Sequence, residues 1–181
     1  MNNFKSIDAT LSVNGKSVKL GTQSLCHILM SFLDLFTDPN ILAELANAED
    51  FELRRCVARS ENLNAETISL LLQDPSESVV EYLFRSKNAT KHLKHEEILY
   101  ALNRSAYLAE KVANYLGQLR KHNPNVNIEE LYSILATHHD CRVRSIIAQD
   151  VTTPLAHLQA LVMDCDADVT RQARETVANI A

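Results

Sequence analysis

The spacing of apolar residues changes once along this chain. Near the start, ATLSVNGKSVKL alternates apolar and polar positions on both sides of Asn14-Gly15, with Leu11 and Val13 before the turn and Val18 and Leu20 after it. Asn-Gly accepts the positive φ angles of a type I′ turn, so the pattern predicts a β-hairpin. From Ser24 onward the apolar spacing is helical.

Helix-start signals recur at close intervals after the hairpin. Asp38-Pro39 and Asp74-Pro75 each read as an N-cap followed by an N1 proline, and Asn64, Asn127 and Thr153-Pro154 each precede an apolar-spaced run. We expect about eleven short helices, joined by two to six residues and paired as antiparallel hairpins. Gly117 is the only glycine among them and is expected to end or bend a helix.

The helical part contains internal repeats. ELRRCVARSENLN from Glu52 aligns with SVVEYLFRSKNAT from Ser78 at an offset of 26, which places Val57 on Leu83 and Ser60 on Ser86. DFELRRCVA from Asp50 also matches DCRVRSIIA from Asp140. The spacing is longer around ALNRSAYLAEKVA, so the middle is irregular. Five hairpins and a terminal helix, TRQARETVANI, account for the chain, and each unit buries its apolar face by stacking.

The repeat pattern D-x-x-V-R-x-x-x-A, followed by a polar link, Pro or Asn and a leucine-spaced helix, resembles the leucine-rich repeat variant, a relative of HEAT-like α-solenoids. His122–Leu135 and Asp140–Leu161 carry most of the likeness, which covers residues 38–181. The resemblance implies a binding protein. The founding member carries an N-terminal iron–sulfur segment with clustered cysteines, whereas this chain has only Cys26 near a hairpin, so no cofactor is expected.

Composition agrees with a helical protein. The 181 residues include only three Gly and four Pro, and the net charge is −5. Four widely spaced cysteines with no CxxC pair indicate free thiols, and no apolar run reaches the length of a signal peptide or membrane span, so a cytoplasmic location is expected. We predict an all-α right-handed solenoid (residues 23–181) behind an N-terminal hairpin (residues 1–22) that caps it or docks elsewhere.

The Asp-Arg spacing that recurs within the repeats suggests a local ion pair in each. Asp50 with Arg54, and Asp140 with Arg144, stand four residues apart with the acid at the helix start. That order suits both the helix dipole and the partner, so these pairs are interpreted as structural rather than catalytic.

Charge is distributed unevenly. Residues 23–84 carry three basic and eleven acidic side chains, whereas residues 85–122 carry eight basic and three acidic ones. The five tyrosines fall in or beside this basic middle. Tyr and Arg are enriched at binding hot spots, so one interpretation is a partner-binding surface centred on the irregular middle; the other is that the tyrosines are core and the lysines only solubilise. The surface residues are Arg85, Lys87, Lys91, Lys94, Arg104, Tyr107, Lys111 and Tyr115.

Two clusters have metal-ligand residue types. His138, His139 and Cys141 could meet Cys165 only if adjacent repeat loops lean together, and His92, His95 and Glu96 could share one helical face. Helix-start and loop roles explain both clusters, so no metal is expected.

No glycine-rich phosphate loop, GxSxG or HExxH motif is present. The sequence therefore predicts a non-enzymatic protein-interaction module for an anionic partner, such as a protein with an acidic segment. A nucleic-acid-binding HEAT-like protein related to DNA alkylation repair is the alternative, although this chain lacks the tryptophan of those glycosylases. A metal-binding accessory protein is a minor alternative. Self-association through the hairpin or the last helix is also open.

Overall fold

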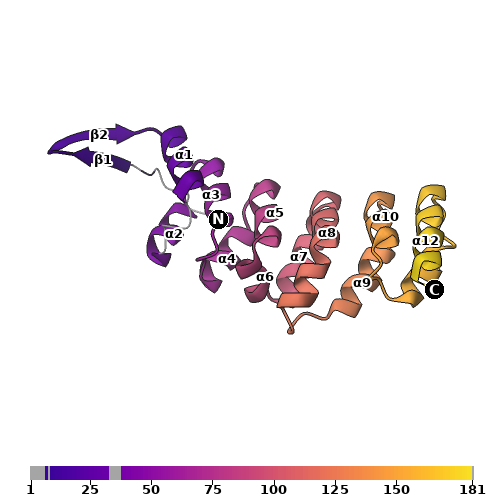
Figure 1. Ribbon diagram of the computed structural model, residues 1–181. Helices are drawn as coiled ribbons and strands as arrows, with labels where there is room; N and C mark the ends of the chain where they lie inside the picture. The colour runs from indigo at the N-terminus through magenta and orange to yellow at the C-terminus, as the bar shows by residue number, and fades with distance from the viewer. Residues whose placement is uncertain (1–6, 8, 33–37, 181) are drawn as a thin grey trace. The chain divides into compact units, whose positions relative to one another are not determined.

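A computed structural model describes residue 7 and residues 9–32 and 38–180. The structure is mostly helical, 68% in all, with twelve helices and one two-stranded antiparallel sheet among the described residues (Figure 1). Two compact units are present, residues 1–93 and residues 94–181. The division between them falls near the irregular middle of the repeat pattern, a boundary that the sequence did not predict.

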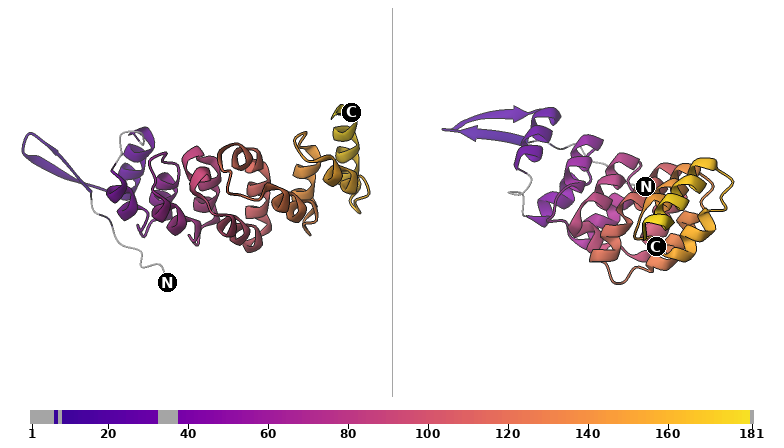
Figure 2. Two further views of the ribbon diagram at one scale, coloured as in Figure 1. Left: turned by 90° about the horizontal axis from the view of Figure 1, so that it is seen from below. Right: turned by 45° about the vertical axis from the view of Figure 1, so that its right-hand side comes forward.

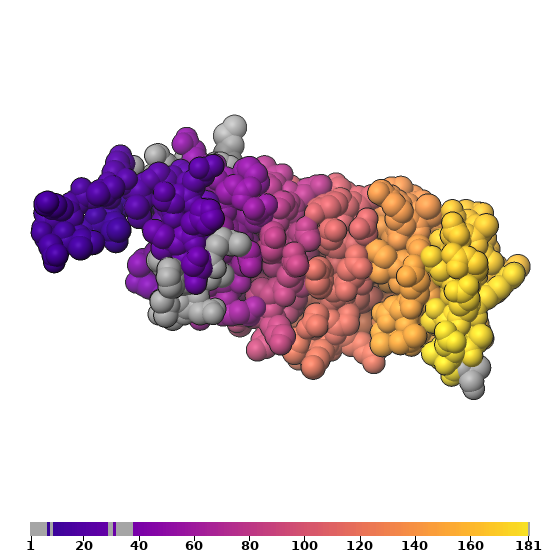
Figure 3. All heavy atoms as spheres, turned by 45° about the horizontal axis from the view of Figure 1, so that its top comes forward, coloured from indigo at the N-terminus to yellow at the C-terminus, as the bar shows by residue number. Residues whose placement is uncertain are grey.

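The N-terminal hairpin is confirmed. Strand β1 (Ala9–Val13) pairs with β2 (Lys16–Leu20), and Leu11 lies opposite Val18. Asn14 and Gly15 both have positive φ, 51° and 76°, as a type I′ turn requires. The hairpin projects from the helices of its unit (Figures 2 and 3), and Leu11, Val13 and Val18 are exposed. The part of the chain that the structure describes therefore leaves its apolar face uncovered.

Six helices lie in the described residues of the first unit. They are α1 (Thr22–Phe32), α2 (Pro39–Leu45), α3 (Phe51–Ala58), α4 (Ala65–Leu72), α5 (Glu77–Arg85) and α6 (Lys87–His92). In this unit α1, α3 and α5 lie side by side, with α2, α4 and α6 along the opposite side (Figure 1). This order agrees with helical hairpins packed in sequence.

The second unit also contains six helices. They are α7 (His95–Arg104), α8 (Ala106–His122), α9 (Ile128–Ala136), α10 (Cys141–Gln149), α11 (Leu155–Leu161) and α12 (Ala167–Ile180). Within it α10 packs between α8 and α12, while α9 and α11 lie on the other side and α7 packs on α8. Gly117 lies inside the continuous helix α8, so the prediction that it ends a helix is wrong. Six leucine, valine and alanine residues of α8 are buried and hold one side of this helix against its neighbours.

Most helix starts are as predicted. Asp38, Asn64 and Asn127 are N-caps whose side chains accept backbone N–H groups of the first turn. One predicted cap is wrong, since the N-cap of α5 is Ser76 rather than Asp74, whereas α11 begins directly after Thr153-Pro154 as predicted. Asp74 and Thr153 are both buried, because the Asp74 carboxylate binds an arginine and the Thr153 hydroxyl donates to the Ile147 carbonyl.

The repeat positions coincide with the core. Val57 and Leu83 are both fully buried, and Leu53 and Val79 are buried as well. Ser60 accepts a hydrogen bond from the Asn62 N–H and Ser86 caps α6, so both aligned serines bind backbone N–H groups at helix ends. Among the described helices, none combines the length and the apolar character needed to cross a lipid bilayer.

Candidate functional site

A buried arginine links adjacent repeats in the first unit. Arg54 of α3 donates to both carboxylate oxygens of Asp74, with Nε at 2.6 Å and Nη2 at 3.1 Å. Its Nη1 donates to the carbonyl oxygens of Ala48 (2.7 Å) and Glu49 (2.8 Å), which precede α3. Asp74 in turn accepts the Ser76 N–H. One side chain therefore fixes the loop before its own helix to the loop before the next repeat helix.

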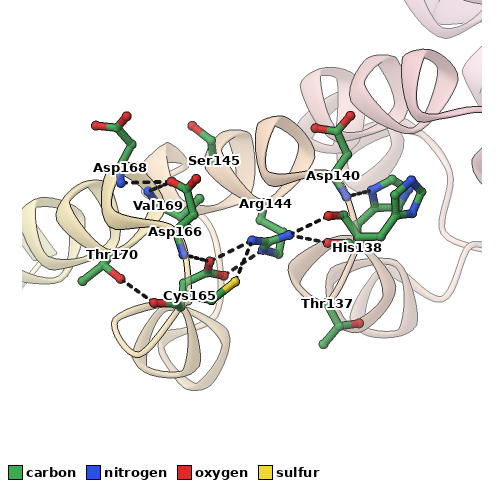
Figure 4. A network of polar contacts seen from close by, with 12 residues as sticks. Thr137, His138, Asp140, Arg144, Ser145, Cys165, Asp166, Asp168, Val169 and Thr170 are labelled. Atoms are coloured by element: carbon green, nitrogen blue, oxygen red, sulfur yellow. Dashed lines mark hydrogen bonds and ion pairs between the residues drawn. The ribbon is translucent and has the colours of Figure 1, made fainter.

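The same arrangement occurs in the second unit, ninety residues later in the sequence. Arg144 of α10 donates to Asp164 from Nε (2.7 Å) and Nη2 (2.8 Å), and its Nη1 donates to the carbonyls of His138 (2.7 Å) and His139 (3.1 Å) (Figure 4). Asp164 accepts the Asp166 N–H. We call each set, Arg54 with Asp74 and Arg144 with Asp164, an arginine staple.

The staples correct the predicted ion pairs. Asp50 and Asp140 are N-caps as their helix-start positions suggested, accepting the N–H groups of Glu52 and Arg142. The guanidinium of Arg144, however, binds Asp164 rather than Asp140, whose carboxylate pairs with Arg142. A bidentate pair at the buried helix ends is stronger than an exposed pair along one helix.

In the second unit, the pKa values of Asp164 and His138 are both shifted by their surroundings. The hydrogen bonds from Arg144 hold the pKa of the Asp164 carboxyl below its usual range. Burial, together with the neighbouring His139, lowers the pKa of His138. Both groups therefore contribute to stability through ionisation states that change at acid pH.

The histidine and cysteine candidates around His138 do not converge on a metal. His138 Nδ1 accepts the Asp140 N–H at 3.1 Å, and the rings of His138 and His139 lie 4.2 Å apart. The Arg144 guanidinium lies between this loop and Cys165, whose sulfur is 3.6 Å from Nη2 (Figure 4). A search of the described residues finds no group of three His, Cys, Asp or Glu placed to hold a metal ion.

The second metal candidate, His92 with His95 and Glu96, does not lie on one helical face, so this prediction is wrong. His92 ends α6 and His95 begins α7, because Leu93 and Lys94 between them are extended. His95 Nε2 pairs instead with Glu130 at 3.1 Å.

The predicted partner-binding surface is divided between the two units. Arg85, Lys87 and Lys91 belong to the first unit and are exposed. In the second unit Lys94 is exposed, but four residues are only partly exposed: Arg104, Tyr107, Lys111 and Tyr115. Three of the eight residues therefore lie in the first unit and five in the second.

Two of the second-unit residues contact each other. Lys111 Nζ lies 4.6 Å from the centre of the Tyr107 ring and 3.7 Å from a Glu110 carboxylate oxygen. These contacts hold the Lys111 side chain against its own helix.

The most concentrated binding chemistry is in the first unit, around Tyr82. Three arginines place their guanidinium carbons near its ring centre: Arg55 at 5.9 Å, Arg59 at 5.5 Å and Arg85 at 5.0 Å. Arg55 and Arg59 are one turn apart near the end of α3, and Tyr82 and Arg85 share a face of α5. Packing of α3 on α5 brings the four side chains together.

A cavity of about 240 Å³ adjoins this cluster. It is lined by Arg59, Glu61, Tyr82, Arg85 and Ser86. Glu61 faces it with a carboxylate that accepts the N–H groups of Lys87 (3.2 Å) and Asn88 (2.7 Å). We call this the Tyr82 cavity.

Only Arg85 of this cluster was among the predicted site residues. Arg55 and Arg59 fall in the stretch 23–84, which is acidic overall. A count of charges along the chain therefore does not identify them as a basic site. The available signal was the repeat offset, which places Arg59 on Arg85 and so predicts two arginines on neighbouring helices.

No family model matches this chain, and a search of curated proteins finds no similar one. The class that the fold defines is a mostly helical protein with a small N-terminal β-hairpin. The resemblance to leucine-rich repeat variants stays a prediction.

Proposed function

We propose that this protein is a non-enzymatic protein-interaction module built as a right-handed α-solenoid of the leucine-rich repeat variant or HEAT-like kind. The observation that carries the proposal is the Tyr82 cluster, in which three arginines surround one half-buried tyrosine beside a cavity. Aromatic and arginine side chains dominate binding energy at protein interfaces. The partner is a protein that presents negative charge.

One feature of the scaffold supports this function. The arginine staple of the first unit fixes the loops before α3 and α5, the two helices that carry the Tyr82 cluster. A preorganised surface binds more tightly because less conformational entropy is lost on binding.

The charge of the first unit argues against nucleic acid as the partner. Phosphate backbones are bound by many cations along an extended surface. Residues 23–84 instead carry eleven acidic side chains, so the Tyr82 cluster is a small basic site on an acidic stretch. That pattern suits a local contact with a protein.

The test is affinity purification of the tagged full chain from native lysate, with and without nuclease. The double variant Arg59→Glu/Arg85→Glu removes the cluster's positive charge. Lys91→Glu/Lys121→Glu makes the same charge change at two exposed lysines outside the cavity and is the matched control.

We expect proteins that remain bound after nuclease treatment, that are lost with the arginine double variant and that are kept by the lysine control. Loss of all bound material on nuclease treatment would support the nucleic-acid alternative instead. Equal recovery with both double variants would show that the Tyr82 cluster is not the binding site.

A further inference from the structure

The Tyr82 cavity is small compared with sites for metabolites. Its volume of about 240 Å³ lies below the roughly 300–1,000 Å³ typical of pockets for drug-sized ligands. A cavity of this size beside an exposed protein surface suits a single side chain of a partner. The ring of Tyr82 provides an apolar wall for the methylene groups of such a side chain.

The charge of the lining selects the kind of side chain. Arg59 and Arg85 contribute two positive charges and Glu61 one negative charge, so the lining has a net charge of +1. The Glu61 carboxylate is fixed in place by the Lys87 and Asn88 N–H groups, so it does not swing away when a ligand enters. A ligand with one negative charge balances this lining.

A carboxylate fits these conditions better than a phosphate. Guanidinium groups bind carboxylates through two parallel hydrogen bonds. A phosphate monoester carries close to two charges at neutral pH, and Glu61 would repel the second. Glu52 beside Arg55, and Glu81 at 3.9 Å from Arg85, add to the negative field around the cavity.

The same acidic surroundings disfavour a long run of acids. Each further carboxylate of a polyacidic segment would meet the negative charge of the first unit without a cavity to receive it. The occupant is therefore one acidic residue flanked by uncharged residues, rather than an acidic tract.

We propose that the Tyr82 cavity is a socket for the side-chain carboxylate of a single Asp or Glu in an otherwise uncharged segment of the partner protein. Arg59 and Arg85 bind the carboxylate, and Tyr82 contacts its methylene stem. This inference rests on the proposed function, because it names the group through which the partner is bound.

The test uses isotope-labelled full-length protein and four synthetic nonapeptides of Ser, Ala and Leu. Their central residue is Glu, Gln or phosphotyrosine, and the fourth peptide carries six consecutive Glu. Nuclear magnetic resonance follows the Nε–H signals of Arg59 and Arg85 during each titration. These signals report binding at the cavity itself.

We expect the single-Glu peptide to shift both arginine signals and to bind at least about tenfold more tightly than the Gln peptide, because a hydrogen-bonded charge is lost. Arg85→Gln should weaken binding by about the same factor, and Tyr82→Leu should weaken it with the arginines still present. Lys91→Gln, the matched control, should leave the affinity unchanged. Tyr82→Phe should also retain it, since the ring is kept.

Two results would overturn the inference. Tighter binding of the phosphotyrosine or six-Glu peptide would contradict the preference for one carboxylate. Absence of any shift at Arg59 and Arg85, while native lysate still yields a nuclease-resistant protein partner, would reject the socket and leave the interaction function standing. Absence of both the arginine shifts and a nuclease-resistant protein partner would reject the two proposals together.

Discussion

The guanidinium group of Arg144 and the carboxylate of Asp164 form a two-point ion pair across twenty residues of sequence, with N–O distances of 2.7 and 2.8 Å. Arg54 and Asp74 form the same pair at the same separation, and each arginine also binds the carbonyls five and six residues before it. In the last repeat Thr170 occupies the equivalent position, and its hydroxyl donates to the carbonyl of Asp164, six residues earlier (Figure 4). A side-chain hydrogen bond to the carbonyl six residues earlier thus recurs at positions 54, 144 and 170.

Removing a staple arginine is expected to destabilise its unit. Arg54 and Asp74 are 3% and 1% exposed, so Arg54→Met leaves a buried carboxylate with no ionic partner and costs about 3–5 kcal/mol. Faster hydrogen exchange of the α3 and α5 amides would report the loss. Arg142→Met, which removes an exposed arginine, is the control and should change exchange little. Equal effects of the two substitutions would contradict a structural role for the staple.

The staple in the second unit makes stability depend on acid pH. The Asp164 pKa is lowered in the folded state, so the stabilisation is complete above the unfolded pKa of about 3.9 and is lost as pH falls through the folded value. Urea unfolding between pH 6 and pH 2 should show this loss. Asp164→Asn should be less stable than the parent at pH 6 and should flatten the acid dependence; an unchanged slope would contradict the pairing.

His138 is expected to affect stability in a higher pH range than Asp164 does. Its pKa is lowered mainly by burial, so the folded state holds its proton less well than the unfolded state does. Stability should therefore fall as pH drops below about 6.5, the usual pKa of histidine. His138→Gln should reduce this dependence between pH 7 and pH 5, as measured by urea unfolding. His27→Gln, on the first unit, is the control and should leave it in place.

The turn of the N-terminal hairpin depends on glycine. Gly15 has φ of 76°, a region that side chains with a Cβ disfavour, although no atom lies near enough to clash with a new Cβ. Gly15→Ala should therefore destabilise the hairpin by about 1 kcal/mol through the backbone alone. Cross-strand nuclear Overhauser effects between Leu11 and Val18 should weaken, while those among α3, α4 and α5 remain. Unchanged Leu11–Val18 effects would argue against the type I′ turn.

Local features were predictable from the sequence because their causes lie within a few residues. Asn14-Gly15 determines the turn, and Asp38 and Asn64 cap the helices that follow them. Asp74 misled the prediction, since its carboxylate is used by Arg54 of the preceding repeat rather than by its own helix. The partner of an ion pair across repeats depends on how helices stack, which local patterns do not specify.

The binding site was predicted only in part for a similar reason. Charge counted along the sequence identified Arg85 but not Arg55 or Arg59, which reach Tyr82 through the packing of α3 on α5. The twenty-residue spacing of Arg54 and Asp74, and of Arg144 and Asp164, was present in the sequence. That spacing indicates an ion pair only where the helices stack so that the loops before them lie side by side.

The most direct measurement of the central claim is site-specific photo-crosslinking of the full chain in nuclease-treated native lysate. Benzoylphenylalanine at position 82 keeps an aromatic ring at the cavity, and the same residue at position 91 is the control. The account predicts a discrete protein crosslink at position 82, absent at position 91 and suppressed by excess single-Glu peptide. A crosslink of equal yield at both positions, unaffected by that peptide, would contradict the claim that the Tyr82 cavity binds the partner.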